Sequence, residues 1–222
     1  DAIAPTYSSL AHNSSNAGRT TLFSAYWNDN LALNPNGKYI FSTNNTGTWV
    51  NDTPVAFTTT PSWANVTKTL NTTGGKVIGY RWYANDTANN WNSTAIQTLT
   101  TVDITPPTYS NVAHNTTQGG SAILFSAYWN DETALAGGGR YIFSTNNTGT
   151  WVNDTPVAFS TTPSWANVTK TLNTTFGAVI GYRWYANDSS NNWNSSTIAT
   201  VTVGDAIAPT YSSLAHNSSN AG

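Results

Sequence analysis

The sequence predicts an all-β protein built from tandem two-sheet antiparallel β-sandwiches, with about seven strands in each. Two observations support this prediction. Short segments of alternating apolar and polar residues recur between turns rich in Asn, Gly and Pro, and no segment of useful length shows helical periodicity. The clearest alternation runs from Val77 to Asp86, and its apolar face consists of Ile78, Tyr80, Trp82 and Ala84. Because such a face has to be covered, a second sheet is expected to pack over it.

A gap-free internal repeat with a period of 102 residues sets the domain organisation. This period is typical of whole domains in a row, because solenoid repeats are shorter. We therefore expect three units: residues 1–102, residues 103–204, and residues 205–222 as the first strand of a third unit. Residues 205–222 reproduce residues 1–18 and differ from the start of the second unit. This difference predicts an alternating array, of which the chain is a segment.

Each unit is expected to contain seven or eight strands. In the first unit these are residues 5–12, 21–27, 39–43, 48–51, 55–58, 63–70, 77–86 and 94–101. The strand at 55–58 follows a proline and is expected at a sheet edge. Lys68 and its copy Lys170 fall on the inward face of their strand, where a cation needs a partner, and Asp86 or Asp188 is the expected one. A Lys–Asn isopeptide crosslink and a surface position for the lysine are the alternatives.

Two motifs accompany the longest strand and the junction between units. Tyr80-x-Trp82-x-Ala84-x-Asp86 is followed by Asn89-Asn90-Trp91, and the junction reads Asp103-Ile104-Thr105-Pro106-Pro107. Over the whole chain, this pattern resembles the tandem immunoglobulin-like and fibronectin-III-like repeats of archaeal and bacterial cell-surface proteins. The chain has no Cys, so it is similar to the branch that lacks the antibody-type disulfide. The resemblance implies a spacer, stalk, adhesin shaft, or surface-layer or filament subunit, and no catalysis.

Asn-x-Ser/Thr sequons recur through both units. They begin at Asn13, Asn44, Asn51, Asn65, Asn71, Asn85, Asn92, Asn115, Asn146, Asn153, Asn167, Asn173, Asn187, Asn194 and Asn217. Between the two copies, several other Asn positions change, but no sequon Asn does, and the third residue varies only between Ser and Thr. We therefore predict N-glycosylation at several of these sites. Asn65, Asn71 and Asn85 are expected on outward faces, while an ordinary polar β-surface is the alternative explanation.

The aromatic content exceeds the needs of one sandwich core. The chain contains 10 Trp and 11 Tyr. Trp49 and Trp91, with their copies Trp151 and Trp193, lie in turn-rich stretches beside sequons and are expected outside the core. Glycans or another protein surface then cover these rings. The alternative is that they plug the ends of the sandwich.

Residues with catalytic or metal-binding chemistry are sparse. His12, His114 and His216 are one repeated position, which is too few ligands for a metal site or a triad, so no enzyme is expected. Asp86 and Asp103 are placed to meet at the domain junction and hold calcium, which makes Asp86, Asp103, Asp188 and Asp205 weak calcium candidates and predicts no other cofactor. Asp is also an ordinary turn residue, which is the alternative explanation.

The net charge of −2 provides no field for nucleic acid, and no run of 18 apolar residues predicts a membrane span in this segment. The junction has almost no spare chain, and Pro106 and Pro107 stiffen it. We therefore expect a structural repeat of a long extracellular, glycosylated rod or filament at an archaeal cell surface, with copies of itself as partners. The partial unit 205–222 is expected either to continue into the next domain or to complete it by strand exchange. An adhesin or carbohydrate-binding module and a passive stalk are the rival hypotheses.

Overall fold

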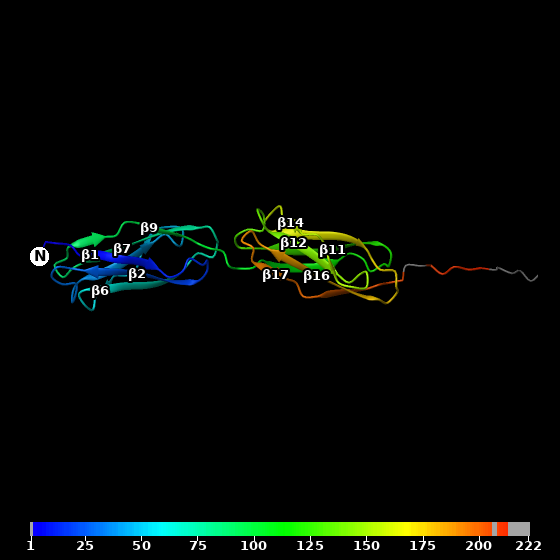
Figure 1. Ribbon diagram of the computed structural model, residues 1–222, viewed down its shortest axis with the longest axis horizontal. Coiled ribbons are helices and arrows are strands. Elements are labelled where there is room, and N and C mark those ends of the chain that lie inside the picture. Colours follow the sequence, from blue (N-terminus) through cyan, green and yellow to red (C-terminus); the bar gives the residue numbers. More distant parts are fainter. Residues whose placement is uncertain (1, 206–207, 213–222) are drawn as a thin grey trace, which may run out of the picture.

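The computed structural model describes residues 2–205 and 208–212, in which every regular element is a β-strand. The strands form two β-sandwiches that follow each other along the long axis of the molecule (Figure 1). Each sandwich has a three-stranded and a six-stranded antiparallel sheet. The predicted fold class, an all-β chain of tandem two-sheet sandwiches, is therefore confirmed.

The first sandwich contains the strands from Thr6 to Thr100. Its smaller sheet has the order β1 (Thr6–His12), β2 (Thr20–Asn28) and β6 (Ser62–Thr69). Its larger sheet has the order β4 (Val50–Asn51), β3 (Lys38–Thr43), β7 (Val77–Asn85) and β8 (Trp91–Ser93), with β5 (Val55–Ala56) paired to β3 and β9 (Gln97–Thr100) paired to β7. The edge position expected for the 55–58 strand is confirmed, whereas β8 lies in a stretch that was expected to be turn.

The second sandwich repeats this topology. Its smaller sheet consists of β10 (Thr108–His114), β11 (Ala122–Asn130) and β15 (Ser164–Thr171). Its larger sheet consists of β12 (Arg140–Thr145), β13 (Val152–Asn153), β14 (Val157–Ala158), β16 (Val179–Asn187), β17 (Trp193–Ser195) and β18 (Ala199–Thr202). Of the stretch 205–222, the described residues 205 and 208–212 form no strand, and the remainder lies outside the described residues.

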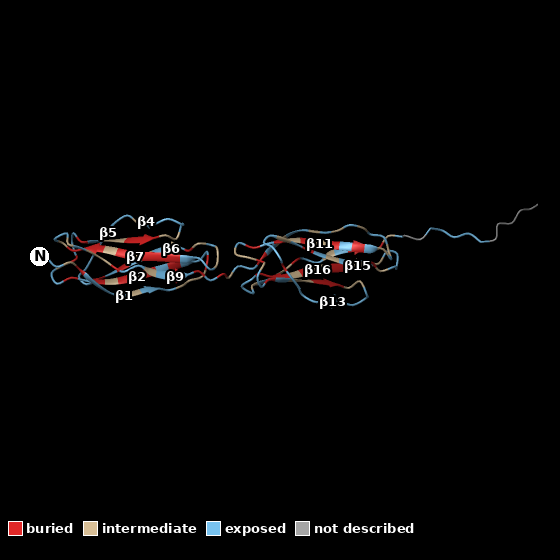
Figure 2. Cartoon of the chain, turned by 90° about the horizontal axis from the view of Figure 1, so that it is seen from above, coloured by how far each residue is buried: buried red, intermediate tan, exposed pale blue. Residues whose placement is uncertain are grey.

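The core of each sandwich is a stack of rings between the two sheets. Alternation in β2 and β7 directs Phe23, Trp27, Tyr80 and Trp82 inward, and all four are at most 3% exposed. The Phe23 and Tyr80 rings, which come from opposite sheets, have centroids 4.8 Å apart in an edge-to-face arrangement. Figure 2 shows this buried layer along the strands, with exposed residues on the loops around it. The inward face expected for β7 is confirmed.

Lys68 does not have the expected partner. It shares the inward-facing phase of β6 with Ala64, but its side chain lies at the rim of the sandwich and is 30% exposed. Its Nζ pairs with Asp52, which follows β4 in the other sheet, and Lys170 pairs with Asp154 in the same way. The expected pairing with Asp86 or Asp188 was wrong, because those residues follow the ends of β7 and β16. Lys68 contacts a carboxylate and not the asparagine that the isopeptide alternative requires.

Candidate functional site

The junction between the sandwiches is built from backbone contacts on both sides of a short connection. Val102 forms a parallel bridge with Asn16, in which the N–H of Ala17 donates to its carbonyl at 2.8 Å. Beyond it, β10 begins at Thr108, so five residues separate this bridge from the next strand. The connection therefore has little freedom to act as a flexible linker.

Two further contacts reach the second sandwich, one from the first sandwich and one from the connection. The Gly74 N–H, in the loop between β6 and β7, donates to the Thr133 hydroxyl across the junction at 2.8 Å. Asn194 Nδ2, in β17, donates to the Pro107 carbonyl at 2.8 Å. Gly74 has to be glycine here, because a Cβ at this position would lie 2.5 Å from the Cβ of Asp103. The β6–β7 loop of the first sandwich is thus in close contact with both the connection and the second sandwich.

Three carboxylates converge at this junction. Asp103 belongs to the connection, Asp131 follows the end of β11, and Asp188 follows the end of β16. One carboxylate oxygen from each lies within 4.8 Å of the others, and the three residues are between 0 and 6% exposed. The sequence pattern identified Asp103 and Asp188 but not Asp131. The usable signal was that β11 and β16 are both followed by Asp and both end at the side of the sandwich where the connection enters.

The other two calcium candidates lie elsewhere. Val77, at the start of β7, pairs with Thr100 near the junction, and Asp86 follows the opposite end of this nine-residue strand. Asp86 therefore does not meet Asp103 across the junction, as the sequence suggested. Its side chain accepts hydrogen bonds from the N–H and Nδ2 of Asn90 at 2.8 and 2.7 Å. Asp205 is exposed after the second sandwich.

Backbone donors hold two of the junction carboxylates. Asp131 Oδ1 accepts hydrogen bonds from the N–H groups of Thr133 and Ala134 at 2.8 and 2.9 Å. Asp103 Oδ1 accepts one from the N–H of Thr105 at 3.0 Å. In both residues the second oxygen, Oδ2, is buried without a hydrogen-bond partner. Each carboxylate is therefore fixed by one oxygen and keeps the other available.

Asp188 is held on both oxygens. Its Oδ1 accepts hydrogen bonds from the N–H groups of Ser190 and Asn192 at 2.8 and 2.9 Å. Its Oδ2 accepts one from Asn192 Nδ2 at 2.8 Å. The same Nδ2 lies 3.4 Å from the Asp103 carbonyl oxygen. Asn192 thus links the second sandwich to the connection and orients the carboxylate between them.

Burial raises the pKa of Asp131 to about 6. The N–H groups of Thr133 and Ala134 stabilise the ionised form and oppose this effect, while the charges of Glu132 and Asp103 add to the rise. The arrangement therefore concentrates negative charge in a region that water does not solvate.

The sequon residues differ in exposure. In the first sandwich Asn13, Asn51 and Asn65 are exposed, Asn44, Asn71 and Asn92 are half-buried, and Asn85 is buried. In the second sandwich Asn115, Asn153 and Asn167 are exposed, Asn146, Asn173 and Asn194 are half-buried, and Asn187 is buried. Asn217 lies outside the described residues. An exposed or half-buried amide leaves room for a glycan, whereas a buried one does not.

The outward position expected for Asn85 was wrong, and its copy Asn187 is buried in the same way. Both are 6% exposed. Asn85 Oδ1 accepts a hydrogen bond from the Lys38 N–H at 2.7 Å, and its Nδ2 donates to Asn89 Oδ1 at 2.9 Å. The turn at 33–37 covers this end of β7, where a Cβ on Gly37 would lie 2.5 Å from the Asn85 carbonyl oxygen. Alternation along β7 cannot reveal a loop that folds over its outer face.

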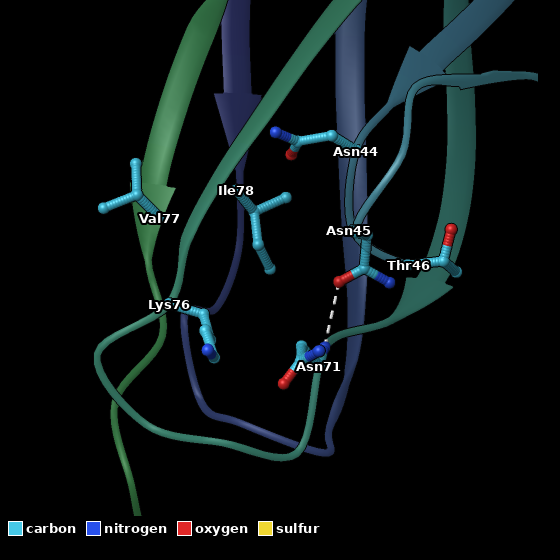
Figure 3. Close-up of a pocket in the computed structure, with 8 residues that line it drawn as sticks. Asn44, Asn45, Thr46, Asn71, Lys76, Val77 and Ile78 are labelled. Atoms are coloured by element: carbon cyan, nitrogen blue, oxygen red, sulfur yellow. Dashed lines mark hydrogen bonds between the residues drawn. The ribbon is translucent and has the colours of Figure 1, made fainter.

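Two sequon residues share one hollow at the junction end of the first sandwich. Figure 3 shows Asn44 and Asn71 lining it with Lys76 and Ile78. Asn45 connects the two sides, because its Oδ1 accepts a hydrogen bond from the Asn71 N–H at 2.9 Å. A glycan on either asparagine would lie over this hollow.

The tryptophans expected outside the core are half-exposed, which confirms that prediction. Trp49, Trp91, Trp151 and Trp193 are 46–47% exposed. Trp49 lies against the outer face of the larger sheet, where a Cβ on Gly79 of β7 would approach its ring to 3.0 Å. It therefore packs on a sheet face and does not plug an end of the sandwich.

Two exposed tryptophans and one aromatic hollow were not identified from the sequence. Trp63 and Trp165 are 48% exposed on the smaller sheets. On the larger sheet of the second sandwich, a shallow hollow is lined by Ser144, Trp151, Asn153, Arg183, Tyr185 and Ile198. The guanidinium of Arg183 lies 4.6 Å from the centre of the Tyr185 ring. An aromatic surface with a cation and amides suits a sugar ring.

The repeated histidine contacts the core. His12 Nδ1 lies 3.1 Å from the Tyr80 hydroxyl, and His114 has the same contact with Tyr182. His216 lies outside the described residues. None of the described segments forms a helix that could cross a membrane.

No protein-family model matches the chain, and no curated protein matches it. Among solved structures, it is similar to the FN1–FN3 domains of chicken CNTN1, with 15% identity and a TM-score of 0.44, covering 88% of this chain and 65% of that one. It is also similar to the chicken interferon gamma receptor alpha chain, with 11% identity, a TM-score of 0.37, and coverage of 92% and 100%.

A third similar structure contains the fibronectin(III)-like modules of CbhA from Clostridium thermocellum, with 16% identity and a TM-score of 0.32, covering 90% of this chain and 94% of that one. The chain spans slightly less than two thirds of the CNTN1 structure. At these values the fold assignment rests on the sheet topology of the chain itself.

Proposed function

We propose that this chain is a non-catalytic structural segment of a long extracellular rod or filament, glycosylated on Asn and assembled from copies of the same two-sandwich unit. Its setting is the surface of an archaeal cell, as the density of sequons first suggested. The observation that carries this proposal is the junction, where backbone bridges and the Gly74–Thr133 hydrogen bond join two similar sandwiches without a flexible linker.

The two free ends of the pair support an alternating array. The position of Gly74 is occupied by Phe176 in the second sandwich, and the position of Thr133 is occupied by Leu31 in the first. Phe176 is 73% exposed and Leu31 is 65% exposed. Where the observed junction has a polar contact, the opposite ends therefore carry two unpartnered apolar side chains. In a rod of alternating units these two residues face each other, and their contact removes both from water.

The glycan part of the proposal uses the exposed and half-buried sequons and excludes Asn85 and Asn187. Asn51, in β4, is two residues from Trp49, and their copies Asn153 and Trp151 line the same hollow in the second sandwich. A glycan on Asn51 is placed to cover the half-exposed Trp49 ring. This cover accounts for the surplus of aromatic surface without a protein partner.

Electron microscopy and intact-mass measurement of the native material test this function. We expect a long fibre with an axial repeat set by the two-sandwich unit and a mass excess in multiples of hexose. A bare monomer that turns over a substrate would contradict the proposal. Isolated rods that end in a distinct terminal domain and make no contact with other copies would favour the passive stalk.

A second candidate function is carbohydrate binding, because the hollow beside Trp151 combines an aromatic ring with Arg183 and Tyr185. Glycan-array binding by the unglycosylated chain, lost in Trp151→Ala, supports this candidate. If the array shows no binding while the native fibre carries a glycan on Asn153, the hollow accommodates the chain's own sugar.

A further inference from the structure

We propose that Asp103, Asp131 and Asp188 bind one divalent cation of the calcium type at the junction between the two sandwiches. The three residues come from the connection and from the ends of β11 and β16, so the bound ion would tie the connection to two strand ends of the second sandwich. The inference concerns this junction alone, and its failure would leave the rod function standing.

The first argument is geometric. A carboxylate oxygen of each residue lies within 4.8 Å of the others. Two oxygens on the same Ca²⁺ lie at most about 4.6–5.2 Å apart, since each Ca–O distance is about 2.3–2.6 Å, so three oxygens within 4.8 Å of one another can share one ion. Ca²⁺ accepts irregular sets of six to eight oxygen ligands, whereas Mg²⁺ requires near-ideal octahedral geometry. Three carboxylates from separate segments therefore suit the larger ion, with backbone carbonyls and water completing its ligands.

The second argument comes from unsatisfied oxygens. Oδ2 of Asp103 and Oδ2 of Asp131 are buried and accept no hydrogen bond, although both residues are 94% removed from solvent. Buried carboxylate oxygens are normally paired, because leaving one without a partner costs its full desolvation. Asp29, the counterpart of Asp131 in the first sandwich, also has a buried Oδ2 without a partner. The same unfilled oxygen in both copies points to a ligand and not to a local defect.

The third argument is charge. In the described residues, the two lysine–aspartate ion pairs are Lys68–Asp52 and Lys170–Asp154, and neither involves the cluster. Three buried carboxylates within a few ångströms need a compensating charge, because like charges at this separation repel strongly in a medium of low dielectric constant. A divalent cation supplies that charge and fills the unpaired oxygens together. A proton shared between two of the carboxylates is the competing explanation.

Calcium binding to the unglycosylated 222-residue chain tests the proposal. The chain is freed of metal with a chelator and titrated with CaCl₂ at pH 7.5 in a calorimeter. We expect saturable binding with a dissociation constant of about 10⁻⁴–10⁻³ M or lower, the range of extracellular calcium modules. Asp131→Asn keeps the Oδ1 acceptor for Thr133 and Ala134 and is expected to weaken binding at least tenfold. Asp154→Asn, which removes the same charge from the same sandwich outside the cluster, is the matched control and leaves the affinity unchanged.

A measurement on the wild-type chain keeps the test independent of variant folding. In amide NMR spectra, Ca²⁺ is expected to shift Gly74, Thr133 and Ala134, which lie at the junction, and to leave the amide of Lys170 in place. No saturable binding, or shifts scattered over surface carboxylates, would overturn the proposal. So would retention of wild-type affinity by Asp131→Asn, or direct detection of a shared carboxyl proton at pH 7.5 in the presence of millimolar Ca²⁺.

A third variant separates position from charge. Gly74→Ala retains all three carboxylates, but its Cβ would lie 2.5 Å from the Cβ of Asp103 and has to displace that residue. We expect at least a fivefold loss of calcium affinity while both sandwiches stay folded. Unchanged affinity in Gly74→Ala, together with unchanged affinity in Asp131→Asn, would place any bound ion elsewhere.

Discussion

At the scale of single residues, an Asn-x-Ser/Thr motif can mark either a glycosylation site or an asparagine that the fold needs for its hydrogen bonds. Asn85 is of the second kind. It begins a sequon, but its amide is buried and hydrogen-bonded to the Lys38 N–H and to Asn89. The identity of Asn at this position in both copies is therefore explained by a hydrogen-bonding role in the fold. Asn65, on the outer face of β6, has no such constraint and suits a glycan.

Asn85→Ala is expected to lower the free energy of unfolding of the first sandwich by about 1–3 kcal/mol, because the Lys38 N–H loses its acceptor and the buried Asn85 side chain is removed. Asn65→Ala changes an exposed position and is expected to stay within about 0.5 kcal/mol of the parent. Urea unfolding of the unglycosylated chain measures both. Equal effects of the two variants would show that the Asn85 amide is dispensable.

Glycopeptide mapping of the native protein is expected to find Asn85 and Asn187 unmodified and hexose on Asn51 or Asn65 and their copies. The reason is steric, since Asn85 is buried and its Nδ2 donates to Asn89 Oδ1, so a sugar on this nitrogen would have to displace Asn89. Sugar found on Asn85 in the folded protein would mean that the turn containing Asn89 opens.

The buried tyrosines give a pH dependence. Burial raises the pKa of Tyr80 and of Tyr182 above the ordinary value of 10.0. The unfolded chain therefore ionises first, so these groups leave stability unchanged below a pH of about 10 and lower it as the pH rises from there towards their folded-state pKa. We expect Tyr80→Phe to resist this alkaline loss better than the exposed control Tyr7→Phe, as measured by circular dichroism against pH. Identical alkaline profiles would contradict the burial argument.

At the scale of elements, the Lys68–Asp52 pair joins β6 of the smaller sheet to the chain after β4 of the larger one. Both side chains are partly exposed, at 30% and 25%, so solvent screens their attraction. The pair is therefore expected to contribute little to the free energy of unfolding, while it sets the relative position of the two sheet edges.

Lys68→Met is expected to change the free energy of unfolding by about 1 kcal/mol or less, because the lost ion pair is partly replaced by apolar contact at the rim. Lys76→Met, at an exposed position, is the control and should be neutral. Thermal unfolding at low and high salt reports the difference. A loss several times larger than that of Lys76→Met would show that the pair holds the two sheets together.

The strands illustrate what the sequence can and cannot predict. Alternation located β2, β6 and β7 and the ring core, because inward and outward positions along a strand are set by the period of two. It did not locate β8, whose three residues are too short for a period to be visible. It also misplaced Asn85 and overlooked Asp131 as a junction residue. Both errors concern tertiary contacts, a turn that folds over a strand and strand ends that meet, and local alternation does not report such contacts. Local pattern thus predicted the sheets, and contacts between loops decided the candidate site.

At the scale of the whole molecule, the two sandwiches lie in line because the connection between them is bonded on both sides (Figure 1). The observed junction is polar, with Gly74 against Thr133. The outer ends differ from it only where the two copies differ, and there they carry Phe176 and Leu31. The repeat therefore contains two kinds of end, which explains why two units and not one form the period of the proposed rod.

In the proposed rod, Phe176 and Leu31 are expected to be buried in the contact between successive units. Exchanging them for the residues of the observed junction, as Phe176→Gly with Leu31→Thr, is expected to weaken association between units, because about 25 cal/mol is lost for each Å² of apolar surface left in water. Val152→Thr, an exposed apolar position away from both ends, is the control. Fibre length by electron microscopy measures the effect, and fibres of unchanged length would contradict the alternating contact.

The bridge between Val102 and Asn16 has a mechanical consequence. When the chain is stretched, tension that leaves a sandwich through Val102 acts first on the hydrogen bonds between Val102 and the backbone of Ser15 and Ala17. The two segments run parallel, so the pull acts along them and has to break their hydrogen bonds at the same time. A pull perpendicular to the segments would break these hydrogen bonds one after another. The parallel bridge at the end of each sandwich therefore resists unfolding of its strands one at a time under tension. Such mechanical resistance suits a filament that is exposed to shear.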